Sequence, residues 1–199
     1  MSRATLTCTV AACALLVGCS SSPGPRYFDY SGADGCSPPN IGHRLGGDLD
    51  QYSDNSLEGL LGIAHMQRSP CFKNWEFDLT ESADGLVLRH DSQYNGLSVS
   101  ALSLEDLPKA TVSASQLLKA FSLRVATKPI IIDLKTLKTL PGLRQAKNIA
   151  EQLSATQTVD VWFIASKENT ERGPDLCSVL GADFEVLLYS QGGPYCSTP

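Results

Sequence analysis

The chain has 199 residues, of which 42% are hydrophobic and 19% charged, and its formal net charge is −5 at pH 7. This length suits one domain with short appendages, and the apolar fraction is large enough to fill a core, which excludes wholesale disorder. The acidic balance argues against a nucleic-acid partner, because phosphate backbones attract basic surfaces. Outside the N-terminus no run of about 20 apolar residues occurs, which excludes a polytopic membrane protein.

The N-terminus has the features of an export signal. Arg3 supplies a positive charge, and the apolar run over residues 5–17 is too short to span a membrane, so residues 1–18 are predicted to be a cleaved signal peptide. The tetrapeptide LVGC that ends at Cys19 resembles a bacterial lipobox, which implies lipid on this cysteine and an exported protein anchored to the cell envelope. An ordinary secretory signal cut at another position is the alternative. Residues 19–37, rich in Ser, Pro and Gly, are predicted to be a flexible tether after the lipidated cysteine.

Four cysteines follow Cys19, an even number that indicates disulfides in an oxidising compartment. Cys36 and Cys71 each precede a predicted strand by a few residues, so we expect them to meet at one end of a sheet. Cys177 and Cys196 would then link the C-terminal segment to the domain. Four cysteines allow three pairings, and four unpaired thiols remain the alternative.

Short strands alternate with helical segments along the rest of the chain. The predicted strands are Ile41–Arg44, Trp75–Leu79, Leu86–Leu88, Ile130–Leu134, Val159–Ile164 and Glu185–Tyr189. The predicted helices, which have capping residues or apolar residues at helical spacing, are 57–64, 104–107, 115–121 and 142–153. This alternation is typical of parallel α/β units, so residues 38–199 are predicted to form one α/β domain.

Carboxylates occur at strand positions that face one side. Because alternate residues of a strand point the same way, Glu76 and Asp78 should point together, as should Asp133 and Lys135. In parallel α/β folds, ligands bind beyond the carboxyl ends of the strands. Convergence of Glu76, Asp78 and Asp133 at that edge would give an oxygen-ligand site suited to Ca²⁺ or Mg²⁺.

Two histidines and two further cations lie at the ends of the same predicted strands. His43 and Arg44 end the first strand, and His90 follows the third. The histidines are candidates for a general acid and a general base, since imidazole titrates near neutral pH. Arg44 and Lys135 are candidates to neutralise the oxygens of a phosphate. Each residue alone is more often a cap or an ion-pair partner, so the prediction depends on their joint occurrence on four successive strands.

The order of these features resembles that of the glycerophosphodiester phosphodiesterase family, which belongs to the phospholipase-C-like barrel phosphodiesterases. The similar segments are Gly42-His43-Arg44-Leu45-Gly46-Gly47, Asp54-Asn55-Ser56-Leu57, Glu76-Phe77-Asp78, Ser82-Ala83-Asp84-Gly85, His90-Asp91 and Ile132-Asp133-Leu134-Lys135. The short helix expected over residues 104–107 is also similar to one in the family. The resemblance extends over residues 41–135 and is faint over residues 136–190.

The resemblance implies a TIM-type (β/α) barrel and the metal-dependent hydrolysis of glycerophosphodiesters to glycerol phosphate and an alcohol. It also implies that the two histidines are the acid and base, that the three carboxylates hold the divalent cation, and that the two basic residues contact phosphate. A small phosphodiester would then be the substrate, with the membrane contacted through the lipid anchor. The alternatives are a related phospholipase or lyase that releases a cyclic phosphate, and a non-catalytic lipoprotein that binds a phosphorylated ligand or another envelope protein.

Several positions depart from the family pattern. Leu45 stands where the family has glycine, and Asp54 and Asp133 each stand where it has glutamate, which is one methylene longer. An eight-stranded barrel takes about 250 residues, with about 200 at the low end, whereas this chain provides six recognisable strands. The barrel is therefore expected to be incomplete.

Overall fold

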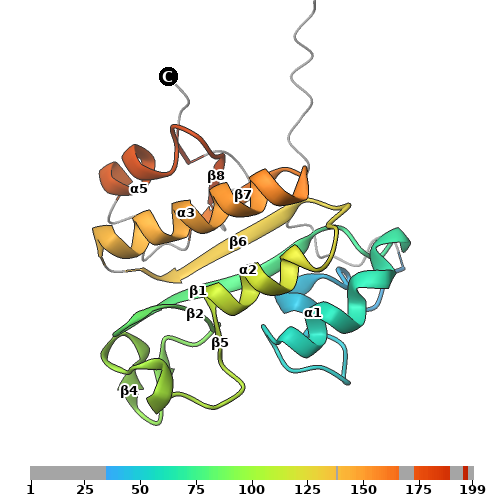
Figure 1. The fold of residues 1–199 in the computed structure, drawn as a ribbon. Helices are drawn as coiled ribbons and strands as arrows, with labels where there is room; N and C mark the ends of the chain where they lie inside the picture. The colour runs from blue at the N-terminus through green and yellow to red at the C-terminus, as the bar shows by residue number, and fades with distance from the viewer. Residues whose placement is uncertain (1–34, 138, 166–172, 189–194, 197–199) are drawn as a thin grey trace, which may run out of the picture.

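The computed structural model describes residues 35–137, 139–165, 173–188 and 195–196, and Figure 1 shows their arrangement. The main sheet has six strands in the order β5-β2-β1-β6-β7-β8. Their bounds are β1 (Trp75–Ser82), β2 (Gly85–Leu88), β5 (Val112–Ser113), β6 (Ile130–Thr136), β7 (Val161–Ala165) and β8 (Val186–Leu188). Strands β1, β6, β7 and β8 are parallel, whereas β2 is antiparallel to β1 and β5 is antiparallel to β2.

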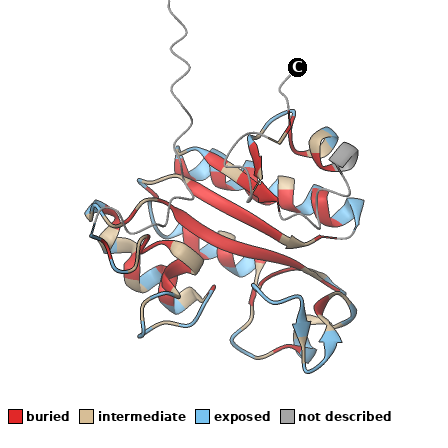
Figure 2. Ribbon diagram, turned by 180° about the vertical axis from the view of Figure 1, so that it is seen from behind, coloured by how far each residue is buried: buried red, intermediate tan, exposed pale blue. Residues whose placement is uncertain are grey.

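Helices cover one face of this sheet. The α-helices are α1 (Leu57–Ile63), α2 (Ala114–Ser122), α3 (Leu140–Gln157) and α5 (Gly173–Val179), and the 3₁₀-helices are η1 (His43–Gly46), η2 (Ala64–Arg68), η3 (Val99–Ala101) and η4 (Leu104–Asp106). A separate hairpin consists of β3 (Gln93–Tyr94) and β4 (Leu97–Ser98). In Figure 1, α2 and α3 lie across the front of the sheet, and Figure 2 shows the long central strands from the opposite side. No helix of the described residues is long and apolar enough to cross a membrane.

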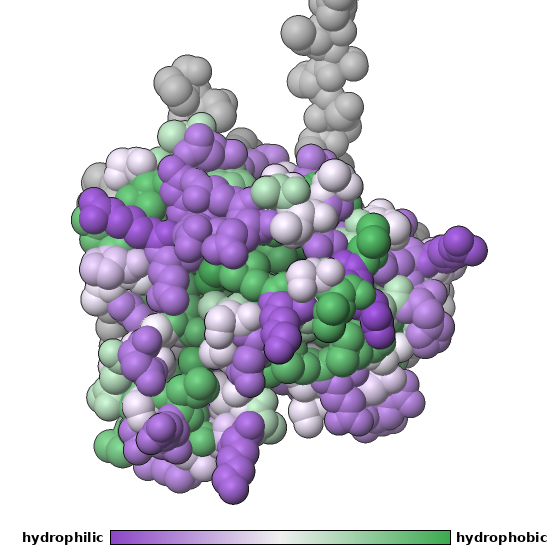
Figure 3. Space-filling model, in the orientation of Figure 1, coloured by the Kyte–Doolittle hydropathy of each residue, from purple (hydrophilic) through white to green (hydrophobic). Residues whose placement is uncertain are grey.

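The core lies between the sheet and the helices. Phe77, Ile132 and Phe163 on three neighbouring strands are fully buried there, and the Phe77 ring lies 6.4 Å from that of Phe121 on α2. Because successive strand residues point to opposite faces, the charged residues that alternate with these apolar ones project from the other face of the sheet. On the surface of the helical side, hydrophilic and hydrophobic side chains are interspersed (Figure 3), as is normal for a globular domain.

Helix starts follow from local sequence. The Ser113 hydroxyl accepts a hydrogen bond from the Gln116 N–H while the Gln116 side chain accepts one from the Ser113 N–H, which makes a capping box at α2. The Thr139 hydroxyl caps α3 through the Gly142 N–H over 3.0 Å. Each cap satisfies backbone donors that have no partner within the helix, so these residue types fix where the helices begin.

Five of the six predicted strands are confirmed within a few residues, but the strand predicted over Ile41–Arg44 is wrong. Arg44 (φ 47°) and Leu45 (φ 56°) adopt the left-handed conformation, so the chain turns in η1 instead of extending. The segment nevertheless lies beside β1, since the Glu76 N–H donates to the Gly42 carbonyl over 3.0 Å. It therefore occupies the edge where a first barrel strand would lie.

Leu86–Leu88 forms a strand, as predicted, but this strand does not belong to the parallel part of the sheet. The turn after Ser82 reverses the chain, and Gly85 pairs with Ser82 to start the antiparallel strand β2. A two-residue turn joins antiparallel strands, whereas a parallel pair needs a long crossover. His90 therefore follows a strand that returns along β1, and the Arg89 N–H donates to the Asp78 carbonyl over 3.2 Å.

Strands β1, β6, β7 and β8 are neighbours in the sheet and run parallel. Together with their helices they form an incomplete TIM-type barrel, as expected. Among the described residues no strand follows β8. The Glu185 carbonyl faces β7, where it accepts a hydrogen bond from the Phe163 N–H, so the next carbonyl, that of Val186, faces the outer edge of the sheet. There it accepts a hydrogen bond from the Tyr195 N–H over 2.7 Å, which gives this edge a backbone partner.

Both expected disulfides are confirmed. Cys36 is bonded to Cys71, and Cys177 to Cys196, each with the two Cα atoms 5.4 Å apart. The first joins the segment before η1 to the loop before β1. It therefore restrains the segment that lies beside β1. The second attaches Cys196, and with it the neighbouring Tyr195, to α5. The two disulfides close loops with sequence separations of 35 and 19 residues. In the chain-entropy account, each disulfide contributes on the order of 3 kcal/mol to stability.

The predicted signal peptide (residues 1–18), Cys19 and most of the predicted tether lie outside the described residues, which begin at residue 35.

Candidate active site

The site begins with the tight turn of η1. Arg44, Leu45 and Gly46 all have positive φ, and the side chain of Leu45 is completely buried. Such conformations cost non-glycine residues roughly 1–2 kcal/mol each and persist only where the surroundings enforce them. Two hydrogen bonds of 2.7 Å hold the turn: the Arg44 N–H donates to Glu76 Oε2, and the Asn55 N–H donates to the Arg44 carbonyl. The glycine expected at position 45 from the family pattern would suit this left-handed backbone.

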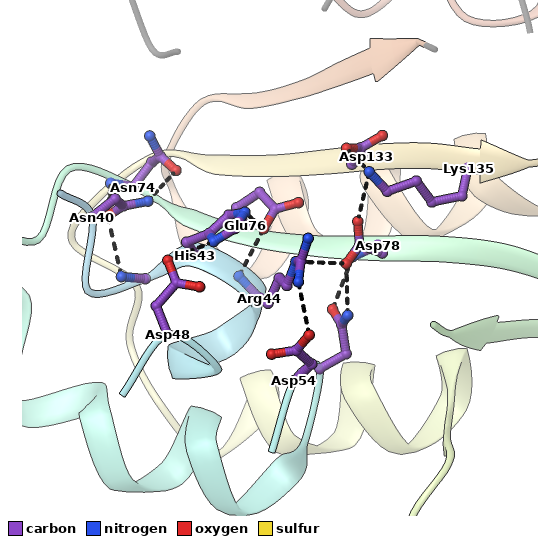
Figure 4. Close-up of polar contacts among 12 residues, drawn as sticks. Asn40, His43, Arg44, Asp48, Asp54, Asn74, Glu76, Asp78, Asp133 and Lys135 are labelled. Atoms are coloured by element: carbon purple, nitrogen blue, oxygen red, sulfur yellow. Dashed lines mark hydrogen bonds and ion pairs between the residues drawn. The ribbon is translucent and has the colours of Figure 1, made fainter. Parts of the chain in front are cut away.

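Three carboxylates converge on the face of the sheet opposite the core (Figure 4). Asp78 of β1 is directly paired with Asp133 of β6, and Glu76 lies two residues earlier on the same face of β1. One carboxylate oxygen from each lies within 4.8 Å of the other two, and all three residues are at most 3% exposed. The shorter Asp133 side chain thus still reaches the cluster. The two-residue period of the sequence predicted this convergence correctly.

Burial of like charges shifts the protonation of the cluster. Burial first, and then the neighbouring Asp78 and Asp133, raise the pKa of Glu76 well above its ordinary value of 4.5. The pKa of Asp133 is also raised, chiefly by burial and against the opposing effect of Lys135. Burial would lower the pKa of Lys135, but the attraction of Asp133 and Asp78 outweighs it and raises that pKa. With all three carboxylates ionised, the cluster would carry more negative charge than the ammonium group of Lys135 neutralises.

The donor set fits a hard divalent cation. Asp78 Oδ1 is buried and makes no hydrogen bond, although it lies 3.1 Å from Lys135 Nζ. Lys135 is thus the cation that compensates this buried oxygen, and its single ammonium group serves both Asp78 and Asp133. Three carboxylates are the oxygen ligands that Ca²⁺ and Mg²⁺ prefer, with further positions filled by water or substrate. Glu76, Asp78 and Asp133 are thus the residues that could hold the ion.

The two basic residues flank this cluster. Lys135 Nζ lies 2.5 Å from Asp133 Oδ2, as expected for residues two apart on β6. Arg44 Nη1 pairs with Asp54 Oδ2 at 2.9 Å, and its buried Nε lies 3.8 Å from Asp78 Oδ2 without a hydrogen bond. Both cations are therefore placed where a phosphate oxygen near the carboxylates would meet them.

His43 points toward the carboxylates. Its Nε2 lies 3.7 Å from Glu76 Oε2, and its Nδ1 lies 2.7 Å from Asp48 Oδ2 (Figure 4). The His43 side chain is 23% exposed, so it is reachable from solvent while remaining packed on the turn. The structure thus brings this predicted residue together with the acidic cluster.

His90 lies on a neighbouring pocket of about 180 Å³. Its side chain is 41% exposed, and its Nδ1 lies 3.0 Å from Asp91 Oδ1; this hydrogen bond is the main reason that the pKa of Asp91 is lowered. Asn55 also lines the pocket, and its amide Nδ2 donates to Asp78 Oδ2 over 2.7 Å. Asn55 therefore lies between the pocket that His90 lines and the carboxylate cluster, and it contacts both.

Two residues of the site were not predicted. Asn55, which is buried and has a φ of 55°, donates to Asp78 and also accepts a hydrogen bond from the Asp78 N–H. Its place in a polar run just before a helix suggests only a cap, and the true N-cap is Ser56. Asp48 follows a pair of glycines, and no sequence pattern connects it with His43. Only the conformation of the turn shows that these two residues meet.

Comparisons with known proteins found a likeness at the level of the fold. No protein-family model matches the sequence, and no curated protein matches it either. Two solved structures have a similar fold. A glycerophosphodiester phosphodiesterase from Parabacteroides distasonis ATCC 8503 is 20% identical with a TM-score of 0.51, over 73% of this chain and 62% of that one. A provisionally assigned glycerophosphodiester phosphodiesterase from Galdieria sulphuraria is 17% identical with a TM-score of 0.55, over 75% of this chain and 61% of that one.

The present chain thus spans about three fifths of the length of either structure. At these identities the likeness establishes the fold alone, which is an incomplete TIM-type barrel.

Proposed function

We propose that the protein is a divalent-cation-dependent phosphodiesterase that hydrolyses glycerophosphodiesters to glycerol phosphate and an alcohol. The observation that carries this proposal is the convergence of Glu76, Asp78 and Asp133 within 4.8 Å on the fold of the glycerophosphodiester phosphodiesterases. His43 and Lys135 contact this cluster directly.

The chain's own groups can carry out the reaction in two proton transfers. One histidine removes the proton from the attacking oxygen as that oxygen bonds to phosphorus. The attacking oxygen belongs to water or to the adjacent glycerol hydroxyl. If the hydroxyl attacks, a cyclic phosphate forms first, and water opens it to glycerol phosphate in a second attack of the same kind. The other histidine gives a proton to the departing oxygen as the phosphorus–oxygen bond to the alcohol breaks. Arg44 and Lys135 offset the negative charge on the remaining phosphate oxygens. A divalent cation, when bound by the carboxylates, supplies further charge stabilisation at those oxygens.

The pocket beside His90 is the place we assign to the departing alcohol. It is lined mainly by polar residues, among them Ser53, Asn55 and Thr111, and a volume of about 180 Å³ suits a small polar alcohol. A group held there would have the imidazole of His90 next to its oxygen, as a proton donor requires.

The test is turnover by the purified mature protein on glycerophosphodiesters with Ca²⁺ or Mg²⁺, followed by phosphorus NMR. The proposal expects glycerol phosphate as the product, and loss of turnover in His43→Ala and in His90→Ala. A cyclic phosphate as the final product would indicate the related lyase reaction. Binding of cation and phosphodiester without turnover would indicate the non-catalytic lipoprotein and would refute the enzymatic proposal.

We also propose that the protein is exported and anchored to the membrane through lipid on Cys19. The two disulfides support an oxidising compartment. Mass spectrometry of the protein purified from membranes should show a chain that begins at Cys19 with an added lipid mass, and Cys19→Ser should release the protein into the soluble fraction. A mature N-terminus elsewhere in the first 34 residues would contradict the anchor.

A further inference from the structure

We propose that Asp48 is a positioning residue that holds the imidazole of His43 so that its Nε2 faces the carboxylate cluster as a proton acceptor. This inference rests on the proposed function, in which His43 transfers a proton. Asp48 belongs to no part of the motifs that suggested the function. Its link to the site is geometric: Asp48 Oδ2 lies 2.7 Å from His43 Nδ1, on the side of the ring opposite the nitrogen that faces Glu76.

The contact fixes which nitrogen of His43 carries hydrogen in the neutral ring. An ionised carboxylate can only accept hydrogen bonds, so Nδ1 must be the donor, and Nε2 keeps its lone pair. That nitrogen, 3.7 Å from Glu76 Oε2, is directed at the place where the attacking oxygen would lie. When Nε2 takes the proton from that oxygen, the resulting imidazolium charge lies beside the Asp48 carboxylate, which stabilises it.

The backbone of the turn is shaped to bring Asp48 to this place. After His43 the chain passes through three residues of positive φ, and Asp48 then lies back against the ring. A Cβ atom at Gly46 would lie 2.9 Å from Ile63 Cγ2, and one at Gly47 would lie 2.2 Å from Asp54 Oδ1. Both positions therefore need glycine for the turn to close.

A surface ion pair alone does not account for this arrangement. Exposed pairs contribute little to stability, and less than the cost of two non-glycine residues in the left-handed conformation. Strain of this kind is typical of sites where a side chain must be held in one orientation. The strained turn thus serves the placement of the His43 ring better than it serves stability.

The test compares Asp48→Asn and Asp48→Ala with Asp50→Asn, which removes the same charge two residues away at an exposed position. We expect kcat to fall about tenfold or more in both Asp48 variants with KM nearly unchanged, and Asp50→Asn to match the wild type. Asp48→Glu, which keeps a carboxylate, should recover part of the lost kcat. Wild-type kcat in both Asp48→Asn and Asp48→Ala would overturn the proposal.

A second measurement is independent of turnover. Nitrogen-15 NMR of the neutral His43 ring at fixed pH should show hydrogen on Nδ1 in the wild type and in Asp50→Asn, and a mixture of both tautomers in Asp48→Ala. The same tautomer in Asp48→Ala as in the wild type would overturn the positioning role. If the wild type hydrolyses no phosphodiester, the proposed function fails, while this spectrum still decides whether Asp48 orients the ring. Melting curves of the variants establish that each is folded.

Discussion

The parallel part of the sheet has two halves, β1 with β6 and β7 with β8, and their side chains differ in chemical character. Strands β1 and β6 carry the acidic cluster and Lys135 on one face and core residues on the other, whereas the described residues of β7 and β8 carry no charged side chain. Both halves supply fully buried aromatic or aliphatic residues to the same core. Among the described residues, the candidate site therefore lies on β1 and β6, whereas β7 and β8 contribute residues to the core. Changes to the carboxylates of β1 and β6 should therefore affect activity without loss of stability, whereas changes to the buried core residues of β7 and β8 should reduce stability and leave kcat little changed.

The largest expected effect is a loss of kcat when a carboxylate of the acidic cluster is replaced. Asp78→Asn removes one buried charge with almost no change in volume, and it should lower kcat about 100-fold or more because several kcal/mol of charge stabilisation are lost. Without added cation its unfolding free energy at pH 7 should equal or exceed that of the wild type, because like charges no longer repel in the cluster. Steady-state kinetics and urea titration measure both quantities. Asp160→Asn, an exposed carboxylate, is the control and should change neither.

Substitutions in the core residues of β7 and β8 should lower stability and leave kcat little changed. Phe163 of β7 is completely buried, and its ring lies 5.5 Å from that of Phe184 in an edge-to-face contact. Phe163→Ala should cost about 3–5 kcal/mol of unfolding free energy through lost burial and the cavity that remains. Per folded molecule, kcat should stay within about twofold of the wild type. A stable variant with a large loss of kcat would refute the division between the two halves.

Binding of a cation should stabilise the protein in a pH-dependent way. The raised pKa of Glu76 means that the folded protein binds more protons than the unfolded chain, so without cation its unfolding free energy falls as pH rises above about 4.5. Cations compete with these protons, so the gain in melting temperature on adding Ca²⁺ or Mg²⁺ should be larger at pH 8 than at pH 5. At 100 times the dissociation constant, the gain corresponds to about 2.7 kcal/mol. Calorimetric melts with cation or chelator measure it, and an equal gain at both pH values would contradict the cluster as the binding site.

The smallest expected effect is the difference in stability between two substitutions at Leu45 in the strained turn. Leu45→Ala and Leu45→Gly both remove a completely buried side chain, so each should destabilise the protein by about 2–5 kcal/mol. In ordinary helices glycine is worse than alanine by about 0.5–1 kcal/mol. At a φ of 56° the order should reverse, with the glycine variant more stable by about 1 kcal/mol. Chemical denaturation of the two variants side by side tests this, and the usual order would show that the turn is not left-handed.

Side-chain periodicity predicted the parts of the site that lie on regular strands. Glu76 and Asp78 were placed on one face by their two-residue spacing, and the apolar run at Ile130–Leu134 identified the strand beside them, which brought Asp133 into the cluster. The expected pairing of Cys36 with Cys71 rested on their positions before two predicted strands, and it is confirmed although the first of these strands does not form. These features follow from patterns that repeat along the chain.

The conformation of the turn at residues 43–48 could not be predicted in the same way. Positive φ at Arg44 and Leu45 is imposed by contacts with residues far along the chain, such as Glu76 and Asn55, and hydrophobic patterns carry no information about it. The roles of Asp48 and Asn55 depend on this turn, so they became visible only in the structure. The two-residue strand β5 was missed because so short a segment has no measurable period.

The central claim is that the three buried carboxylates form a cation site that serves phosphodiester hydrolysis. Its most direct test is to remove cations from the purified wild type with a chelator and then measure glycerophosphodiester hydrolysis as Ca²⁺ or Mg²⁺ is added back. We predict no turnover in the chelated protein, saturable recovery in the wild type, and little recovery in Asp78→Asn at the same concentrations. Full turnover in the chelated wild type, or equal recovery in Asp78→Asn, would contradict the claim.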